Sequence, residues 1–283
     1  MPHPSLLPAR RALVMGVLNV TPDSFSDGGR FLSPDAAIAH GRELIAEGAD
    51  IVDIGGESTR PGADPVDEAE ELRRVLPVVE ALAGEATLSI DTRKAGVARA
   101  AVAAGASIVN DISASLFDVA ADTGSTWVAM HMQGDPRTMQ AEPRYDDVVG
   151  EVEAFLADRI EVARRAGIAD VWIDPGFGFG KALSHNLLLL RHLDRLVALG
   201  APVLVGVSRK RTLGTITAHS DAGIAARRAG SDRLDLDGPV PPTPVDDRRE
   251  ASLAMATWAM AAGVHVVRAH DVRPTVQAAL VVA

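Results

Sequence analysis

The sequence contains no cysteine and few aromatic residues, and both absences narrow what the chain can be. None of its 283 residues is a cysteine, which excludes disulfide bonds and metal sites with thiolate ligands. Aromatic residues make up only 4% of a chain that is 47% hydrophobic, so branched aliphatic residues and alanine must form the core. The lack of disulfides fits a reducing compartment, and we expect a cytoplasmic protein.

Several other features are missing as well. No stretch is long and uncharged enough to span a membrane, and residues 1–11 lack an apolar run of signal-peptide length, so we expect them to form a flexible leader. The net charge of −10 argues against binding to nucleic acid or to a membrane surface. The absence of His-x-His and His-Glu-x-x-His spacing argues against zinc, and neither a Gly-x-Gly-x-x-Gly nor a Walker motif is present.

Short apolar segments that end in polar residues recur along the chain, and they alternate with amphipathic segments. The apolar segments predict strands at 13–19, 51–57, 88–91, 108–109, 127–130, 171–173, 203–208 and 264–267. Eight strands alternating with helices predict an α/β fold, a (β/α)8 TIM barrel, formed by residues 12–283 as a single domain. The carboxyl ends of its strands share one face, which carries the active site in such barrels.

The helices are expected at 36–48, 66–83, 94–104, 146–166, 183–199, 251–262 and 275–282, with a weakly marked one near 117–122. Several of these segments stop at a glycine that suits a helix C-cap. Residues 215–247 are rich in Gly, Pro, Asp and Arg and show little periodicity. We interpret them as a flexible insertion in preference to a mobile lid.

Two polar loops follow the first two expected strands. The loop 19–29, Asn-Val-Thr-Pro-Asp-Ser-Phe-Ser-Asp-Gly-Gly, is longer than a βα turn requires, which is typical of a loop that moves over a ligand. A rigid turn in which Asn19 bonds to backbone is an equal alternative. In the loop 57–62, Arg60 can form a fork for an anion, or it can pair with a nearby carboxylate.

Two further motifs can serve a planar ligand. Asp91 and Asn110 end adjacent strands, where they could recognise the edge of a nitrogen heterocycle or form a hydrogen-bond network at the barrel rim. The run 174–181, Asp-Pro-Gly-Phe-Gly-Phe-Gly-Lys, has alternating glycines that would let the backbone approach a flat ligand closely.

The last two strands are followed by basic residues. Lys210, Arg268 and His270 should meet where TIM barrels bind phosphate, although an ion-pair cluster with acidic neighbours is the alternative. An oxygen-ligated Mg²⁺ at Asn19, shared with phosphate oxygens, suits this arrangement.

These motifs, taken together and in order, resemble the dihydropteroate synthase family of folate biosynthesis, the target of sulfonamides. The similarity runs from about residue 12 to the end, in the motifs at 15–29, 53–62, 89–92, 110–111, 130–134, 174–181, 208–210 and 268–272. The family is a homodimeric transferase with this barrel fold. The resemblance implies condensation of (7,8-dihydropterin-6-yl)methyl diphosphate with 4-aminobenzoate, giving 7,8-dihydropteroate and diphosphate.

The resemblance also implies roles for individual residues. The pterin would be bound by Asp91, Asn110, Ile112, Met130, Asp174, Lys210 and Arg268, and the diphosphate by Asn19, Arg60, Arg268 and His270, with Mg²⁺ on Asn19. The 4-aminobenzoate pocket would comprise Phe25, Thr59, Pro61, Phe179, Ser208 and Lys210. The catalytic residues would be Asp91, Asp174, Lys210 and Arg268.

The sequence departs from the family pattern in the long segment 215–247 and in residues 249–252, which replace a small, glycine-containing start of the next helix. Both departures concern the expected dimer contact more than the chemistry. Two other hypotheses are a pterin-binding methyltransferase that serves a corrinoid and a non-catalytic pterin-binding paralogue. The methyltransferase would not need the 19–25 loop or Ser208-Arg209-Lys210. The hypothesis of a non-catalytic paralogue predicts that the loops have lost their motif residues.

Overall fold

Eight parallel strands form the centre of the molecule in the computed structural model, which describes residues 11–21, 34–58, 64–228 and 240–283. The hydrogen-bonded order β6-β5-β4-β3-β2-β1-β8-β7 is closed by a parallel bridge between Ile173 and Val203. The strands are β1 (Leu13–Asn19), β2 (Ile51–Gly55), β3 (Thr87–Asp91), β4 (Ile108–Asp111), β5 (Thr126–Met130), β6 (Val171–Asp174), β7 (Leu204–Gly206) and β8 (Val266–Ala269).

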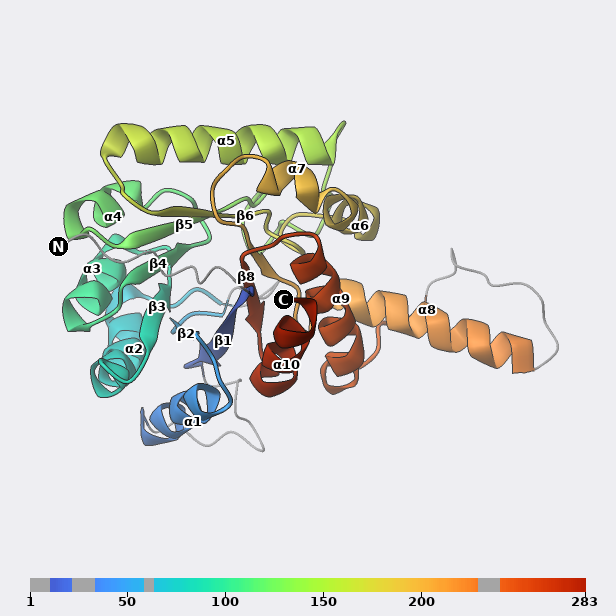
Figure 1. Ribbon diagram of the computed structural model, residues 1–283, viewed down its shortest axis with the longest axis horizontal. Helices are drawn as coiled ribbons and strands as arrows, with labels where there is room; N and C mark the ends of the chain where they lie inside the picture. Colours follow the sequence, from blue (N-terminus) through green and yellow to red (C-terminus); the bar gives the residue numbers. More distant parts are fainter. Residues whose placement is uncertain (1–10, 22–33, 59–63, 229–239) are drawn as a thin grey trace.

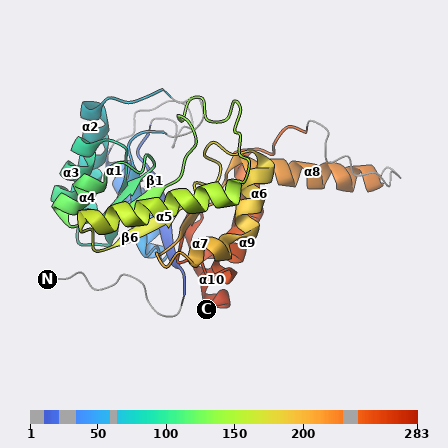
Figure 2. The same ribbon diagram turned by 90° about the horizontal axis from the view of Figure 1, so that it is seen from above.

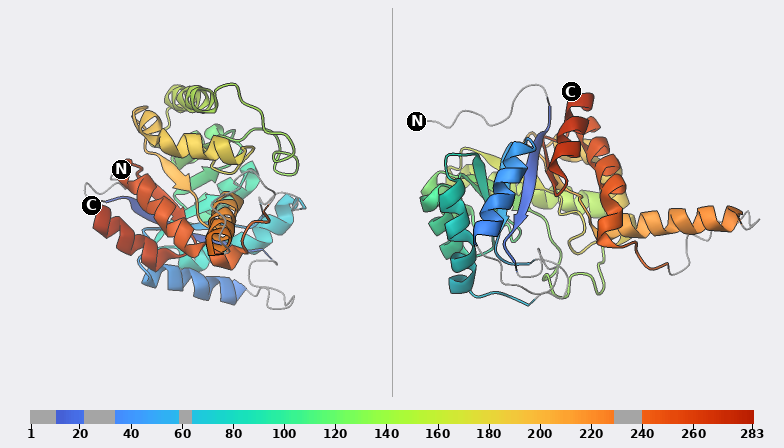
Figure 3. Two further views of the ribbon diagram at one scale, coloured as in Figure 1. Left: turned by 90° about the vertical axis from the view of Figure 1, so that its right-hand side faces the viewer. Right: turned by 90° about the horizontal axis from the view of Figure 1, so that it is seen from below.

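Helices surround this barrel, as Figure 1 and the left view of Figure 3 show. They are α1 (Pro34–Ala46), α2 (Glu68–Leu82), α3 (Ala95–Ala104), α4 (Phe117–Thr123), α5 (Val148–Ala166), α6 (Leu183–Arg191), α7 (Leu193–Val197), α8 (Arg211–Arg228), α9 (Arg249–Ala261) and α10 (Val272–Val282), with a 3-10 turn η2 (Val245–Arg248). The expected (β/α)8 barrel is confirmed. Among the helices in the described residues, none is both long and apolar enough to cross a membrane.

Local sequence signals explain where the helices begin and end. The side chain of Asp67 accepts a hydrogen bond from the backbone N–H of Glu70 at 2.7 Å and caps α2. Asp147 caps α5 in the same way. Gly167 ends α5 in the left-handed conformation, with φ 74°, which a residue with a side chain adopts only with strain.

The strands separate two apolar layers. Their outward side chains pack against the helices, and their inward side chains form a separate cluster inside the barrel: Leu13, Met15, Ile51, Ile108, Val128, Trp172, Leu204 and Val266. Because side chains alternate along a strand, the next inward position lies two residues further on. Those positions hold Val17, Asp53, Asn110, Met130, Asp174, Gly206 and Arg268. The barrel interior therefore changes from apolar to mainly polar at its carboxyl end.

Two helical expectations need correction. The helix expected over 183–199 is divided into α6 and α7 at His192, which has non-helical dihedral angles (φ −116°, ψ 31°). The segment 215–247 was expected to be irregular, but residues up to 228 belong to the 18-residue helix α8, while 229–239 lie outside the described residues. Figures 1 and 2 show α8 projecting from the barrel. Because its far half packs against little, it has no apolar stripe that the sequence could reveal.

Candidate active site

An arginine and two aspartates from three strands form a network at the carboxyl end of the barrel. Arg268 on β8 donates from Nε to Asp53 Oδ2 at 2.5 Å and from a terminal nitrogen to Asp91 Oδ2 at 2.9 Å. Asn110 on β4 donates to the same Asp53 oxygen at 3.1 Å. Asp91 and Asn110 are register partners on β3 and β4, so the prediction that they are neighbours is confirmed.

The network leaves polar atoms buried without a partner. The second carboxylate oxygens of Asp53 and Asp91 and the hydroxyl of Ser89 have no hydrogen-bond partner among the described residues. A buried acceptor of this kind is costly, which points to a donor supplied by a ligand. Burial raises the pKa of Asp91 to about 7, although the charge of Arg268 opposes this shift.

A second charged pair lies on the β6–β7 side of the mouth. The Asp174 carboxylate accepts a hydrogen bond from the backbone N–H of Gly176 at 2.7 Å. Burial raises its pKa, with Lys210 acting in the opposite direction. The Lys210 ammonium donates to the carbonyl oxygen of Phe177 and lies 4.7 Å from the ring centroid of Phe179. Burial lowers the pKa of Lys210 to about 8, although Asp174 opposes this shift.

Two of the glycines after β6 have a packing role that the sequence did not indicate. A Cβ at Gly176 would lie 1.8 Å from the carbonyl oxygen of His131, and one at Gly180 would lie 2.2 Å from that of Gln133. Both glycines have positive φ, 65° and 61°. They therefore permit close packing against the loop after β5, and the expectation that this backbone approaches a flat ligand stays a prediction.

The polar and basic side chains at the ends of β7 and β8 bind different partners. Ser208 Oγ lies 3.0 Å from Nδ1 of His270 and also accepts the His270 backbone N–H at 3.2 Å. Arg209, in contrast, forms two hydrogen bonds to the carboxylate of Asp271. Lys210, Arg268 and His270 thus gather on the β6–β8 side, but Lys210 and Arg268 are already bound to protein oxygens.

The remaining predicted site residues divide into two groups. Asn19 ends β1 opposite Gly55, with its side-chain oxygen 3.8 Å from where a Gly55 Cβ would stand. Ile112 and Met130 are buried, with 5% and 4% exposure. The other group, Phe25, Thr59, Arg60 and Pro61, lies outside the described residues.

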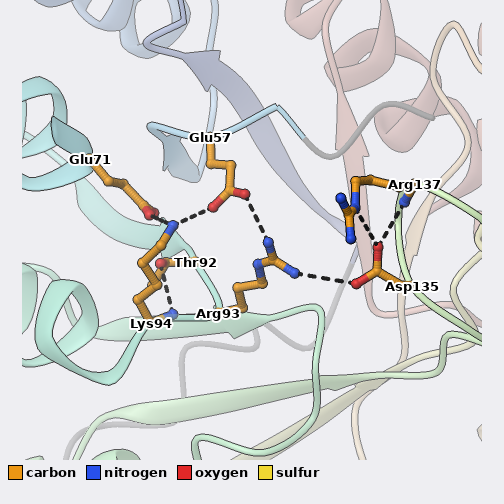
Figure 4. Close-up of polar contacts among 7 residues, drawn as sticks. All are labelled: Glu57, Glu71, Thr92, Arg93, Lys94, Asp135 and Arg137. Carbon is orange, nitrogen blue, oxygen red and sulfur yellow. Dashed lines mark hydrogen bonds and ion pairs between the residues drawn. The ribbon is translucent and has the colours of Figure 1, made fainter. Parts of the chain in front are cut away.

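A network of ion pairs crosses the β2–β3 side of the mouth (Figure 4). The Lys94 ammonium donates to the carboxylates of both Glu57 and Glu71, and Arg93 donates to the other Glu57 oxygen at 3.1 Å. Arg93 also lies 3.9 Å from Asp135. With Asp91 and Ile112, the residues Glu57, Arg93 and Asp135 line a cleft, so the network borders the predicted pterin site.

The sequence did not identify three residues of this face as parts of the site. Asp53 lies within the expected strand 51–57, but nothing in the sequence indicated that it binds Arg268, 215 positions away. Lys181 was part of a motif, yet its nearly complete burial, 2% exposed, was not foreseen. Lys94 gave no signal beyond a charge at a helix start. Asp111 was grouped with Asn110, but its carboxylate turns to the loop before α4, where it accepts hydrogen bonds from backbone N–H groups.

Comparison with known proteins agrees with this geometry. A family model described as pterin binding enzyme matches residues 15–270. The dihydropteroate synthase of Mycobacterium leprae is 46% identical over 282 residues, which cover 95% of this chain and 92% of that protein.

Solved structures give the same result. Dihydropteroate synthase of Yersinia pestis in a sulfonamide drug complex superposes with a TM-score of 0.83 at 43% identity, covering 96% of this chain and 93% of that one. The Xanthomonas albilineans enzyme with 4-aminobenzoic acid gives 0.82 at 46% identity, covering 96% and 92%. The chain therefore belongs to the pterin binding enzyme family and, within it, to the dihydropteroate synthases.

Proposed function

We propose a division of roles among the residues at the barrel mouth for the reaction of this family. The chain is a transferase that condenses (7,8-dihydropterin-6-yl)methyl diphosphate with 4-aminobenzoate to give 7,8-dihydropteroate and diphosphate. The observation that carries the assignment of roles is the convergence of Asp91, Asn110, Asp174, Lys210 and Arg268 at one end of the barrel.

In the proposal, the pterin lies in the mouth with its nitrogen-rich edge toward Asp91, Asn110 and Asp174. The unpartnered oxygen of Asp91 supports this placement, because the ring would supply the missing donor. Ile112 and Met130 would form the apolar walls. Lys210 would donate to the ring, and Arg268 would stack on it.

The diphosphate would be bound by Asn19, Arg60, Arg268 and His270. Mg²⁺ usually takes one or two protein oxygens and completes its shell with phosphate oxygens and water, so the side-chain oxygen of Asn19 at the end of β1 suits it. Among the described residues, no group of three or more His, Asp or Glu could hold the ion without the substrate. The ion would neutralise charge on the departing diphosphate.

The 4-aminobenzoate would occupy the β7 side of the mouth. Its pocket would comprise Phe179, Ser208 and Lys210, completed by Phe25, Thr59 and Pro61. The ammonium of Lys210, close to the ring of Phe179, supports binding of an aromatic carboxylate there. The same pocket would accept a sulfonamide.

The chemistry proposed is dissociative. The bond between the methylene carbon and the diphosphate oxygen breaks, and diphosphate departs with the electron pair. The aniline nitrogen then attacks the carbocation, the C–N bond forms, and a proton is released. No residue acts as a nucleophile; the protein contributes positioning and electrostatic stabilisation. Anionic Asp91 and Asp174 would favour the cationic intermediate, and Arg268 would stabilise the leaving anion.

A homodimer and a cytoplasmic location are part of the proposal. Exposed apolar side chains support a contact through α9 and α10: Trp258 is 58% exposed, Leu280 63% and Val281 84%. The location remains a prediction from the cysteine-free composition.

The experiment is incubation with the pterin diphosphate, Mg²⁺ and 4-aminobenzoate, with diphosphate release measured in the presence and absence of the amine. We expect release that depends on the amine, together with formation of dihydropteroate. A sulfonamide in place of 4-aminobenzoate should give a pterin–sulfonamide adduct. Diphosphate release that is unchanged by the amine, or no release at all, would reject the assignment in favour of one of the alternatives.

A further inference from the structure

The loop after β6 is held mainly by side chains, together with a backbone hydrogen bond from the Phe179 N–H to the Gly176 carbonyl oxygen at 3.0 Å. Each carbonyl oxygen from residue 176 to residue 181 accepts a hydrogen bond from a side chain. The donors are Lys181 to Gly176 and Phe179, Lys210 to Phe177, Gln140 to Gly178, Tyr145 to Gly180, and Asn186 to Lys181. The conformation of this loop therefore depends on those donors.

Lys181 lies at the centre of this arrangement. Its ammonium is 3.1 Å from the carbonyl oxygen of Gly176, 3.0 Å from that of Phe179 and 3.3 Å from that of His131, and 2.9 Å from Nδ1 of His131. The described part of the chain gives it no carboxylate within ion-pair distance. Three carbonyl dipoles point their negative ends at one position, and a cation there removes their mutual repulsion.

The same loop carries groups that the reaction uses. It starts beyond Asp174, presents the Phe177 carbonyl to Lys210, and places the ring of Phe179 4.7 Å from the Lys210 ammonium. We propose that Lys181 is a positioning residue for the condensation, because its buried ammonium sets the loop that holds Lys210 and Phe179 in place. This inference rests on the proposed roles of Lys210 and Phe179.

A purely structural role makes a different prediction. Buried ionic groups can often be replaced by apolar residues of similar size without loss of stability. If Lys181 only fills space, Lys181→Met should fold and turn over normally. If Lys181 positions the loop, the variant should fold but bind 4-aminobenzoate poorly, because three carbonyl oxygens lose the Lys181 ammonium and the loop shifts.

The first test is steady-state kinetics of Lys181→Met beside the wild type. We expect the KM for 4-aminobenzoate to rise and kcat to fall, each at least about 10-fold, since displacement of reacting groups by 1 Å costs up to about 100-fold. Wild-type KM and kcat in the variant would overturn the inference, whatever its thermal stability. A wild type without amine-dependent diphosphate release would instead refute the proposed function, so the two failures are distinguishable.

The second test restores the charge chemically. Since the chain has no cysteine, Lys181→Cys introduces a single thiol. In denaturant, its thiolate attacks 2-bromoethylamine, a C–S bond forms and bromide leaves, which gives an ammonium group at nearly the length of lysine. Iodoacetamide, with loss of iodide, gives a neutral amide as the matched control.

After refolding of both products, alongside wild type treated in the same way, we expect the aminoethylated protein to regain most of the lost kcat/KM. The amide-bearing protein should remain at least about 10-fold lower. Equal kcat/KM in the two products would overturn the inference, because it would show that the charge at this position is not used.

Discussion

The two sides of the barrel mouth bind lysine in different ways. On the β2–β3 side, Lys94 bonds to the carboxylates of Glu57 and Glu71 (Figure 4); we call Glu57, Glu71, Arg93 and Lys94 the paired cluster. On the β6–β7 side, Lys181 and Lys210 donate to backbone carbonyl oxygens; we call these two lysines and the loop 176–181 the carbonyl cluster.

The partners determine the charge state of each lysine. Burial opposes the charge on Lys94, but hydrogen bonds to Glu57 and Glu71 outweigh it and raise the pKa of that lysine. In the carbonyl cluster, burial lowers the pKa of Lys181 to about 7 and that of Lys210 to about 8. The comparison separates a cluster in which carboxylates balance the charge of the lysine from one in which the lysines donate to uncharged backbone oxygens and lose their proton more readily.

The largest expected effect is on stability, in the paired cluster. Lys94→Met leaves the fully buried carboxylate of Glu71 without its cation, whereas Glu57 keeps Arg93; we expect a loss of about 3–5 kcal/mol in the free energy of unfolding. Lys181→Met leaves only carbonyl oxygens unpaired and should cost less, about 1–3 kcal/mol. Urea denaturation of both variants measures the difference.

A matched control tests the cause. Adding Glu71→Leu to Lys94→Met removes one unmatched buried charge, and the double variant should recover part of the stability that the single variant loses. A larger loss for Lys181→Met than for Lys94→Met would contradict the distinction between the two clusters.

The next effect is on turnover. Lys210→Ala in the carbonyl cluster, or Arg268→Ala between the two clusters, should reduce kcat at least about 100-fold, the usual loss for a preorganised charge contact. Amine-dependent diphosphate release measures it. Arg164→Ala, on the exposed surface of α5 and paired with Glu161, is the matched control and should leave kcat unchanged; near-normal kcat in both site variants would reject the assigned roles.

The effect of pH on activity should be smaller than that of these substitutions, and it should reflect the ionisation of two groups at the barrel mouth. Anionic Asp91, with its pKa raised to about 7, is lost as pH falls below that value. Cationic Lys210, with its pKa lowered to about 8, is lost as pH rises above it. We expect kcat/KM to fall on both sides, by about tenfold per pH unit.

Lys210→Arg identifies the alkaline limb. Since a guanidinium stays charged throughout this range, the variant should lose the part of the decrease in kcat/KM that Lys210 causes near pH 8, whereas a decrease that begins near pH 7 would belong to Lys181. An alkaline limb that stays at the same pH in the variant would assign it to another group, including one on a substrate.

The smallest effect is expected at the edge of the paired cluster. The side chain of Arg93 is 34% exposed, its contact with Asp135 is 3.9 Å long, and its other partner, Glu57, still binds Lys94, so Arg93→Ala should change stability by less than about 1 kcal/mol. Urea denaturation of the variant and the wild type should show this small difference in stability at low salt and almost no difference at high salt, because salt screens exposed pairs. A loss as large as that of Lys94→Met would extend the paired cluster outward to Asp135.

The sequence was sufficient for the barrel because its signals are local. Alternating side chains and glycine stops define strands and helices, and parallel order then brings Asp91 beside Asn110. Partner choice across the mouth is not local: the bond from Arg268 to Asp53 joins β8 to β2, and no spacing rule indicates it.

The other features that the sequence did not predict also have physical causes. Helix α8 contains two glycines and several threonines and projects from the barrel, so neither intrinsic propensity nor an apolar stripe revealed it. The glycines at 176 and 180 are needed because another backbone passes close by, and a sequence shows only that glycine is present, not what approaches it.

The change of polarity inside the barrel makes strand register intolerant of small deletions. In β6, Trp172 faces inward in the apolar layer and Asp174 faces inward at the mouth, whereas Ile173 packs outward. Loss of one residue from this strand would exchange the two faces, turning Ile173 into the mouth and a carboxylate into the layer beneath the helices. Changes of length that keep this site intact must therefore fall in the segments between strands.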